Sequence, residues 1–98
     1  MPAYVIGAVD RVEPEAYSSE YGQQAMRVIE RYGGKILTRN HLRIEGLEGD
    51  WRPGRVVLIE FPTYERAKEW YESADYQALV PLRQRYGRTH FITLVEAI

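Results

Sequence analysis

The sequence predicts an α+β fold of the split-βαβ, ferredoxin-like kind, in which helices cover one face of a four-stranded antiparallel sheet. Four short runs are rich in β-forming residues, and helical patterns separate the first run from the second and the third from the fourth. The element order is therefore β-α-β-β-α-β. The chain has 98 residues, of which 45% are hydrophobic, so we expect one domain over residues 1–98.

The first strand and the first helix follow directly from their residue types. Ala3–Val9 is a short apolar run rich in β-formers and is predicted to be a strand. Glu13-Pro14-Glu15 favours the start of a helix, because proline is tolerated in the first turn and carboxylates there complement the helix dipole. Gly33-Gly34 is typical of a helix end. Between these limits, one helix face carries Tyr17, Tyr21, Ala25, Val28, Ile29 and Tyr32.

The middle of the chain holds a second strand and a turn-rich loop. Lys35–Arg39 is predicted to be a strand, and its resumption over Leu42–Leu47 is left open. Several glycines and a proline then interrupt residues 46–54, where Trp51 stands in polar surroundings. We expect a loop there.

The second half repeats the strand–helix–strand order. Arg55–Phe61 is predicted to be the third strand, and Thr63 is suited to cap a helix over Tyr64–Glu72. A break separates this helix from a second helical stretch, Tyr76–Tyr86, and Thr89–Val95 is the expected last strand.

The strands are apolar on both faces, which points to a partner. In the third strand Val57, Ile59 and Phe61 point one way, and Val56 and Leu58 point the other way. Helices can cover only one face, and a large exposed apolar patch is rare on a monomer. The sequence therefore predicts a homodimer through the sheet faces, a dimeric α+β barrel. The alternative is that single β-formers on an exposed face are tolerated.

Composition excludes several classes of protein and site. The formal charge is −1, which argues against nucleic acid binding. The third strand also offers aliphatic residues where RNA-binding sheets place stacking aromatics. Without cysteine there is no thiolate site, and two histidines far apart in the chain are weak evidence for metal. We expect no metal, no cofactor and no membrane association, and a cytoplasmic location.

Several motifs resemble a known family over almost the whole chain. The segment EGDWRP-x-R-VVLIEFP, followed by WY-x-S-x-x-YQAL-x-x-LR, is similar to the domain of unknown function 1330 family. The matching residues are Gly33, Gly34, Arg39, Glu48, Gly49, Asp50, Trp51, Arg55, Glu60, Phe61, Pro62, Ala67, Trp70, Tyr71, Ser73, Tyr76 and Arg83. The resemblance implies a dimeric α+β barrel and brings no established activity. Wider relatives of that barrel group include cofactor-free monooxygenases and isomerases.

The candidate site residues lie mainly at strand ends. Arg39 and Arg55 sit at the ends of adjacent strands, where a guanidinium can hold a carboxylate. Glu60 lies in an apolar strand and needs a partner or a raised pKa, and His41 lies between two arginines, so these two are the candidate catalytic groups. The alternative is a set of internal Arg–Glu pairs that fix the strand ends.

Three aromatic residues complete the candidate set. Trp51 either covers a pocket or anchors its own loop. Tyr17 and Tyr21 are candidate ligand-binding residues if a cavity opens between the first helix and the sheet, and otherwise are packing residues.

Two functions follow from these residues. The first is a homodimer with a pocket for a small anionic or aromatic compound, with a cofactor-free oxygenase or isomerase as its enzymatic form. The second is a structural or regulatory dimer without ligand chemistry.

Overall fold

The four predicted strands form one antiparallel sheet. The computed structural model of the chain describes residues 1–38, 43–52 and 54–98. The strands are β1 (Ala3–Arg11), β2 (Lys35–Ile36), β3 (Val56–Phe61) and β4 (Gly87–Glu96). They lie in the order β2-β3-β1-β4, and each neighbouring pair is antiparallel. This is the ferredoxin-like fold that the sequence predicts.

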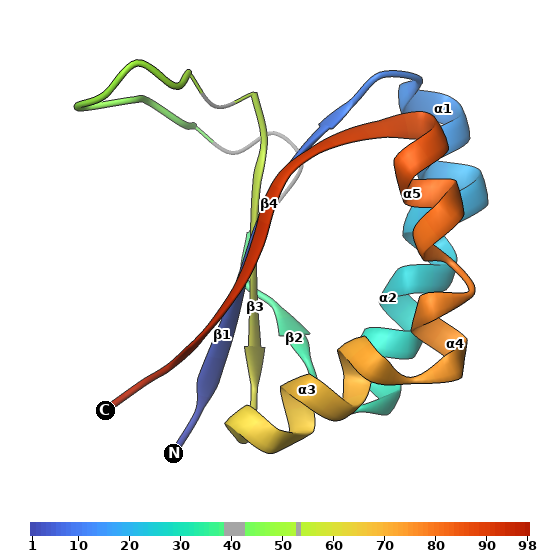
Figure 1. Cartoon of the computed structure of the whole chain (residues 1–98), viewed down its shortest axis with the longest axis vertical. Coiled ribbons are helices and arrows are strands. Elements are labelled where there is room, and N and C mark those ends of the chain that lie inside the picture. Colours follow the sequence, from blue (N-terminus) through green and yellow to red (C-terminus); the bar gives the residue numbers. More distant parts are fainter. Residues whose placement is uncertain (39–42, 53) are drawn as a thin grey trace.

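The long pair formed by β1 and the edge strand β4 extends beyond the predicted limits. The two strands pair from Ala3↔Glu96 to Arg11↔Gly87, with a bulge between Ala8 and Val9. His90 has no partner in this register, because Ala8 lies opposite Phe91 and Val9 opposite Thr89. Such a bulge bends the strand and increases its twist. The extended pairing carries β4 along the whole sheet, and both chain ends meet at the same end of it (Figure 1).

The second strand is shorter than predicted. β2 covers Lys35–Ile36, and the chain leaves the ladder after Leu37, whose backbone N–H donates to the Leu58 carbonyl. Thr38 continues the contact through its hydroxyl, which accepts from the Leu58 N–H at 3.2 Å. Residues 43–47 form no strand, so the resumption left open for this segment is wrong over those residues. Arg39, Asn40, His41 and Leu42 lie outside the described residues.

The first helical segment changes its winding partway along. It consists of α1 (Pro14–Ala16), the π-helix η1 (Tyr17–Gly22) and α2 (Gln23–Arg31), which follow one another without a break. The π-helical turn is seen where the Gln23 N–H donates to the carbonyl five residues earlier, in Ser18. As predicted, the segment begins at Pro14 and closes at Gly33, whose φ of 82° is a left-handed value that favours glycine.

The second helical segment has three parts. α3 (Tyr64–Glu72) has the predicted bounds, and Thr63 caps it by accepting from the Arg66 N–H at 3.0 Å. Ser73 is extended and caps α4 (Ala74–Gln77) through the Tyr76 N–H. α5 (Val80–Tyr86) follows, with Pro81 in its first turn. The predicted single stretch over Tyr76–Tyr86 is therefore two short helices.

All helices lie on one face of the sheet and form the core with it (Figure 1). The buried side chains come from alternate positions of β1 and β3 and from the inner faces of the helices. They are Val5, Val9, Tyr17, Tyr21, Ala25, Val28, Ile29, Ile59, Phe61, Ala67, Trp70, Tyr76 and Leu79. Among the described residues, none forms a helix on the opposite face of the sheet, and the loop around residues 43–52 extends from the upper end of the sheet on that side (Figure 1).

Candidate ligand-binding site

A cavity of about 600 Å³ lies between the first helical segment and the sheet. Its sheet side is apolar and includes Val5, Ile59 and Ile92. Exposed residues of η1 and α2, among them Gln23 and Arg27, line it as well and form its rim. A volume of this size fits a small organic ligand.

The π-helix brings two tyrosines to the cavity wall. Tyr17 and Tyr21 both line the cavity and are both buried, with ring centroids 5.0 Å apart. A π-helical turn is wider than an α-helical turn, so residues four apart lie almost above one another. Gly87 allows the Tyr17 ring to approach β4, because a Cβ on this glycine would lie 2.9 Å from Tyr17 Cε2.

Basic side chains dominate the charged part of the wall. In the described part of the chain, the lining includes Arg11, Arg27, Arg55 and Arg83, against one acidic residue, Glu30. The guanidinium of Arg55 lies over the ring of Tyr17, 5.5 Å from its centroid. The whole chain carries a formal charge of −1, so the cavity concentrates positive charge that the molecule does not have on average.

A buried hydrogen-bonded chain forms part of the wall. Arg83 Nη1 donates to the Tyr76 hydroxyl at 2.8 Å, and the Tyr76 and Tyr21 hydroxyls are 2.7 Å apart. Arg83 Nε donates to Thr89 Oγ1 at 3.2 Å. Arg83 is 4% exposed, and it is the one charged residue that is buried among the described residues.

The phenols of Tyr17 and Tyr21 stay protonated at neutral pH. Burial raises the pKa of Tyr21 far above its ordinary value, and the contact with Tyr76 raises it further. Burial also raises the pKa of Tyr17, although the Arg55 guanidinium partly opposes the effect. These tyrosines therefore act as hydrogen-bond donors and not as bases.

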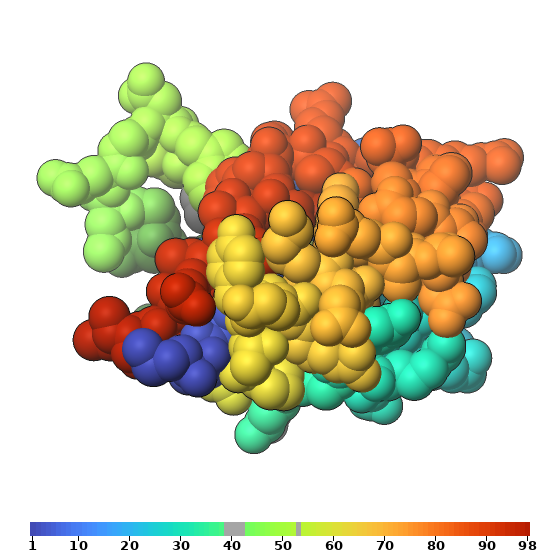
Figure 2. Space-filling model, turned by 60° about the horizontal axis from the view of Figure 1, so that its bottom comes forward, coloured from blue at the N-terminus to red at the C-terminus, as the bar shows by residue number. Residues whose placement is uncertain are grey.

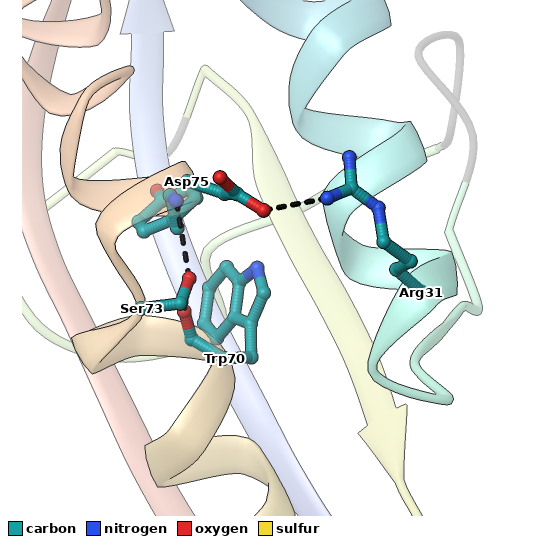
Figure 3. A network of polar contacts seen from close by, with 5 residues as sticks. Arg31, Trp70, Ser73 and Asp75 are labelled. Atoms are coloured by element: carbon teal, nitrogen blue, oxygen red, sulfur yellow. Dashed lines mark hydrogen bonds and ion pairs between the residues drawn. The ribbon is translucent and has the colours of Figure 1, made fainter.

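Trp70 closes one side of the cavity and packs on Tyr76, with ring centroids 4.4 Å apart. Its indole lies beside the ion pair between Arg31 and Asp75 and the Ser73 cap (Figure 3). The indole N–H is buried and donates to none of the described residues.

The predicted site residues fall into three groups. Tyr17 and Tyr21 line a cavity between the first helical segment and the sheet, which was the condition for their role, and Arg55 lines the same cavity. Arg39 and His41 lie outside the described residues. Glu60 and Trp51 lie elsewhere.

Glu60 lies on the open face of the sheet, away from the cavity. It pairs with Tyr4 in the β1–β3 register and accepts a hydrogen bond from the Tyr4 hydroxyl at 3.1 Å. The predicted need for a partner is therefore met by a phenol. This carboxylate also raises the pKa of Tyr4.

Trp51 anchors its own loop and does not line the cavity. Its ring lies 5.7 Å from the rings of both His90 and Phe91, on β4. His90 Nε2 in turn contacts Asp10 Oδ2 at 2.7 Å. Of the two interpretations of Trp51, the structure shows the loop anchor.

The sequence analysis did not assign Tyr76, Trp70 or Arg83 to the predicted site. Tyr76 and Trp70 have the spacing of ordinary core residues, and no local pattern distinguishes them. Arg83 did carry a signal, since an arginine between the helical residues Val80 and Tyr86 is a charge on a partly buried stretch.

No helix in the described part of the chain is long and apolar enough to cross a membrane. The described residues also contain no group of three or more His, Cys, Asp or Glu side chains placed to hold a metal ion.

The fold and the cavity define a ferredoxin-like α+β domain with a basic, phenol-lined cavity between its sheet and its first helical segment. The chain belongs to the family described as "Domain of unknown function (DUF1330)", whose model matches residues 2–98. A comparison with curated proteins found no match.

Two solved structures from Rhodopseudomonas palustris share the fold. One is the RPA0582 protein of unknown function, a structural genomics target, at 23% identity and a TM-score of 0.69, with 99% of this chain and 82% of that chain covered. The other is the methylated RPA0582 protein, at 21% identity and a TM-score of 0.72, with 99% and 81% covered. At this identity the likeness shows the fold alone.

Proposed function

We propose that the chain is a homodimeric small-molecule-binding domain whose cavity takes a small anionic, aromatic compound. The observation that carries the proposal is the charge of the cavity wall, where four arginines stand against one glutamate in the described lining. A guanidinium recognises a carboxylate through paired hydrogen bonds, and a partly enclosed site strengthens this attraction.

The rest of the wall favours a ligand with a flat apolar body. Val5, Ile59 and Ile92 offer aliphatic contact, and the rings of Tyr17 and Trp70 offer aromatic contact. Aromatic rings pack on one another in offset or edge-to-face arrangements, which gain energy beyond the buried area alone.

The described wall supports binding better than catalysis. Tyr17 and Tyr21 have raised pKa values and hold their protons, so they donate hydrogen bonds without removing a proton from a ligand. A cofactor-free oxygenase or isomerase needs a base, and of the two predicted catalytic groups Glu60 lies on the far face of the sheet and His41 lies outside the described residues. The carboxylate in the described lining is Glu30, which is exposed. We therefore place ligand binding before the enzymatic form of the proposal.

Titration calorimetry on the wild-type chain tests the ligand. Benzoate and naphthoate are expected to bind, and their uncharged amides are expected to bind at least roughly tenfold more weakly, since one charge-assisted hydrogen bond is worth about 1.5–3 kcal/mol. A thermal-shift screen of small carboxylates and phenols widens the search. If no member of such a library shifts the midpoint or releases heat, the ligand-binding proposal is wrong.

The second part of the proposal, the homodimer, rests on the open face of the sheet. Ile6, Val56 and Leu58 face this side together with Phe91 and Val95, as their pairing in the register shows. Phe91 is 39% and Val95 is 45% exposed. A second copy that lays the same face on this one would remove these side chains from water.

The loop around Trp51 extends the same apolar surface. Leu47 is 84% exposed, and Ile44 is 38% exposed. The loop stands away from the body beside β4 and reaches past the open face (Figure 2). In a two-fold dimer it would lie along the partner, and this would account for apolar side chains on a projecting loop.

Light scattering tests the dimer. The expected mass is twice the chain mass of 11.4 kDa. Leu58→Asp, on the open face, is expected to give the single-chain mass, because the interface would bury an unpaired carboxylate. Arg85→Asp, on an exposed part of α5, is the matched control and is expected to keep the wild-type mass. A wild-type mass near 11.4 kDa contradicts the homodimer.

The alternative function is a structural or regulatory dimer without a ligand. It shares the open-face interface with the main proposal and differs in the cavity. A dimeric mass together with no binding from the ligand library would favour it.

A further inference from the structure

One hydrogen atom of the buried tyrosine pair is left over by the hydrogen bonds among the described residues. Arg83 can only donate, so the Tyr76 oxygen accepts from it. The contact between Tyr76 and Tyr21 uses one hydroxyl hydrogen, whichever tyrosine donates it. In either direction one phenolic hydrogen remains to be donated, from Tyr21 or from Tyr76. Both tyrosines line the cavity.

The positive charge of Arg83 lies beside this tyrosine pair, and its hydrogen bonds to described residues include no carboxylate. Its partners are the hydroxyls of Tyr76 and Thr89, and both are neutral. A buried charge with only neutral partners is costly unless an opposite charge comes close. The side chain is 4% exposed and lines the cavity, so that opposite charge can come from a ligand.

We infer that the tyrosine pair Tyr21–Tyr76 and Arg83 form an oxyanion site at the inner end of the cavity, which takes the charged oxygen of an aromatic carboxylate or phenolate. The inference rests on the proposed function and adds the position and orientation of the ligand. The oxyanion accepts the leftover phenolic hydrogen and lies beside the guanidinium. The ring of the ligand then lies against the aliphatic side chains of the sheet, Val5, Ile59 and Ile92.

The hydrogen-bond donors of this site come from both helical segments. Their side chains meet at one point of the cavity, as the recognition of a single oxyanion requires. Tyr21 comes from η1, Tyr76 from α4 and Arg83 from α5. The three side chains are between 1% and 8% exposed, so water competes little with a ligand for their hydrogen bonds.

Arg83→Met and titration calorimetry with benzoate and naphthoate test the inference. The affinity is expected to fall roughly 10- to 100-fold, because a charge-assisted hydrogen bond is lost. The midpoint of thermal unfolding without ligand is expected to stay or rise, because methionine fills a similar volume without a buried charge. A purely structural role would instead lower that midpoint and leave the affinity unchanged.

Two matched variants on the same helix serve as controls. Arg85→Met removes one positive charge at an exposed position of α5, and Tyr86→Phe removes one hydroxyl outside the cavity lining. Both are expected to bind benzoate like the wild-type chain. Tyr76→Phe is expected to weaken binding, because Arg83 then loses one of its two acceptors among the described residues and Tyr21 loses its hydrogen-bond partner.

Two probes distinguish a carboxylate ligand from a phenolate ligand. A carboxylate site binds benzoate equally well at pH 6 and pH 9, because benzoate is charged throughout. A phenolate site binds 4-nitrophenol more tightly as the pH rises through the pKa of the probe. Either result, with loss of binding in Arg83→Met, supports the oxyanion site and identifies the group that occupies it.

The outcomes separate this inference from the proposed function. If the wild-type chain binds the probes and Arg83→Met binds them equally well, the oxyanion site is wrong and the ligand-binding proposal stands. If the wild-type chain binds none of them, both fall. If Arg83→Met does not fold, nitrogen NMR of the wild-type guanidinium groups decides. Saturating benzoate is expected to shift the Arg83 Nε resonance and not that of Arg85, and an unmoved Arg83 resonance overturns the inference.

Discussion

The two faces of the sheet carry similar aliphatic residues, but these residues are buried on one face and partly exposed on the other. On one face Val5 and Ile59 are buried beneath helices, next to a cavity with arginines and phenols. On the other face Ile6 and Leu58 remain partly exposed, beside Phe91 and the Tyr4–Glu60 hydrogen bond. Strand residues alone therefore do not decide burial. The helices decide it, because they cover one face of the sheet and leave the other uncovered.

The polar groups differ between the two faces as well. On the helical face Arg83 is buried with neutral hydroxyl partners, which leaves a charge for a ligand to balance. On the open face Glu60 is only half-buried and is served by one phenol. The helical face is therefore the site of recognition in our proposal, and the open face is the site of assembly.

The largest expected effect is on the free energy of unfolding, when one phenylalanine on each face of the sheet is replaced by alanine. Phe61→Ala removes a side chain that is 0% exposed and packs on Trp70. It is expected to lower the free energy of unfolding by about 3–5 kcal/mol. Phe91→Ala, at 39% exposure, is expected to cost about 1 kcal/mol or less in the single chain. Urea unfolding measures both.

Protein concentration sharpens this first comparison. If the open face is a dimer interface, the cost of Phe91→Ala grows with protein concentration, because the wild-type dimer is stabilised by mass action. The loss of stability in Phe61→Ala is expected to be about the same at every protein concentration. Equal costs for the two variants would contradict the difference in burial between the faces.

The next effect concerns two glycines on the strands beside the cavity. Gly87→Ala places a Cβ 2.9 Å from Tyr17 Cε2 and 3.0 Å from the Asp10 carbonyl oxygen, and is expected to cost about 1–3 kcal/mol. Gly7→Ala is the matched control, because its nearest neighbour would be Ile92 Cγ1 at 3.8 Å. It is expected to change the stability by less than about 1 kcal/mol. Thermal unfolding of both variants measures the difference, and equal midpoints would show that Tyr17 can move away freely.

Alkaline pH acts on the helical face through its tyrosines. The folded chain holds the pKa of Tyr17 and Tyr21 above the ordinary value of 10.0, so the unfolded chain loses these protons first. The stabilisation is fully present below pH 10 and is lost as the pH rises further, by up to about 1.4 kcal/mol per pH unit for each phenol. Urea unfolding between pH 8 and pH 11 measures the slope. Tyr21→Phe is expected to have a shallower slope, and an unchanged slope would contradict the assignment to Tyr21.

The smallest effect is expected for the exposed ion pair between Arg31 and Asp75. Their side chains are 60% and 55% exposed, so water and salt screen the attraction. A double-mutant cycle with Arg31→Ala and Asp75→Ala is expected to give a coupling energy of about 0.5 kcal/mol. A coupling above about 2 kcal/mol would show that this pair, beside Trp70, belongs to the core and not to the outer surface.

The sequence predicts the elements well where the local signals are strong. The helix α3 begins at a threonine cap and follows a regular apolar spacing, and its predicted bounds agree with the structure. The second strand is predicted too long, because the chain leaves the ladder after Leu37 although Thr38 is a strand-like residue type. The length of a strand depends on how many residues of the neighbouring strand are available for pairing, which only the tertiary structure determines.

The candidate site was predicted in part. Tyr17, Tyr21 and Arg55 line the cavity because the first helical segment and the start of β3 flank the same space. Glu60 was predicted to need a partner, and it has one in Tyr4, but the sequence does not say which face of the strand the helices cover. Tyr76 and Arg83 were missing from the predicted site because Tyr76 joins Arg83 to Tyr21, which lies 55 residues away from Tyr76 along the chain.

The sequence by itself determined the order of strands and helices, the helix caps and the two-sided apolar strands, because these depend on neighbouring residues and on spacing. The tertiary structure decided which face became the core, and it gathered Tyr21, Tyr76 and Arg83 from three helices around one cavity. Such a site needs side chains that are distant along the chain to lie within hydrogen-bonding distance. Only the packing of the helices on the sheet sets those distances.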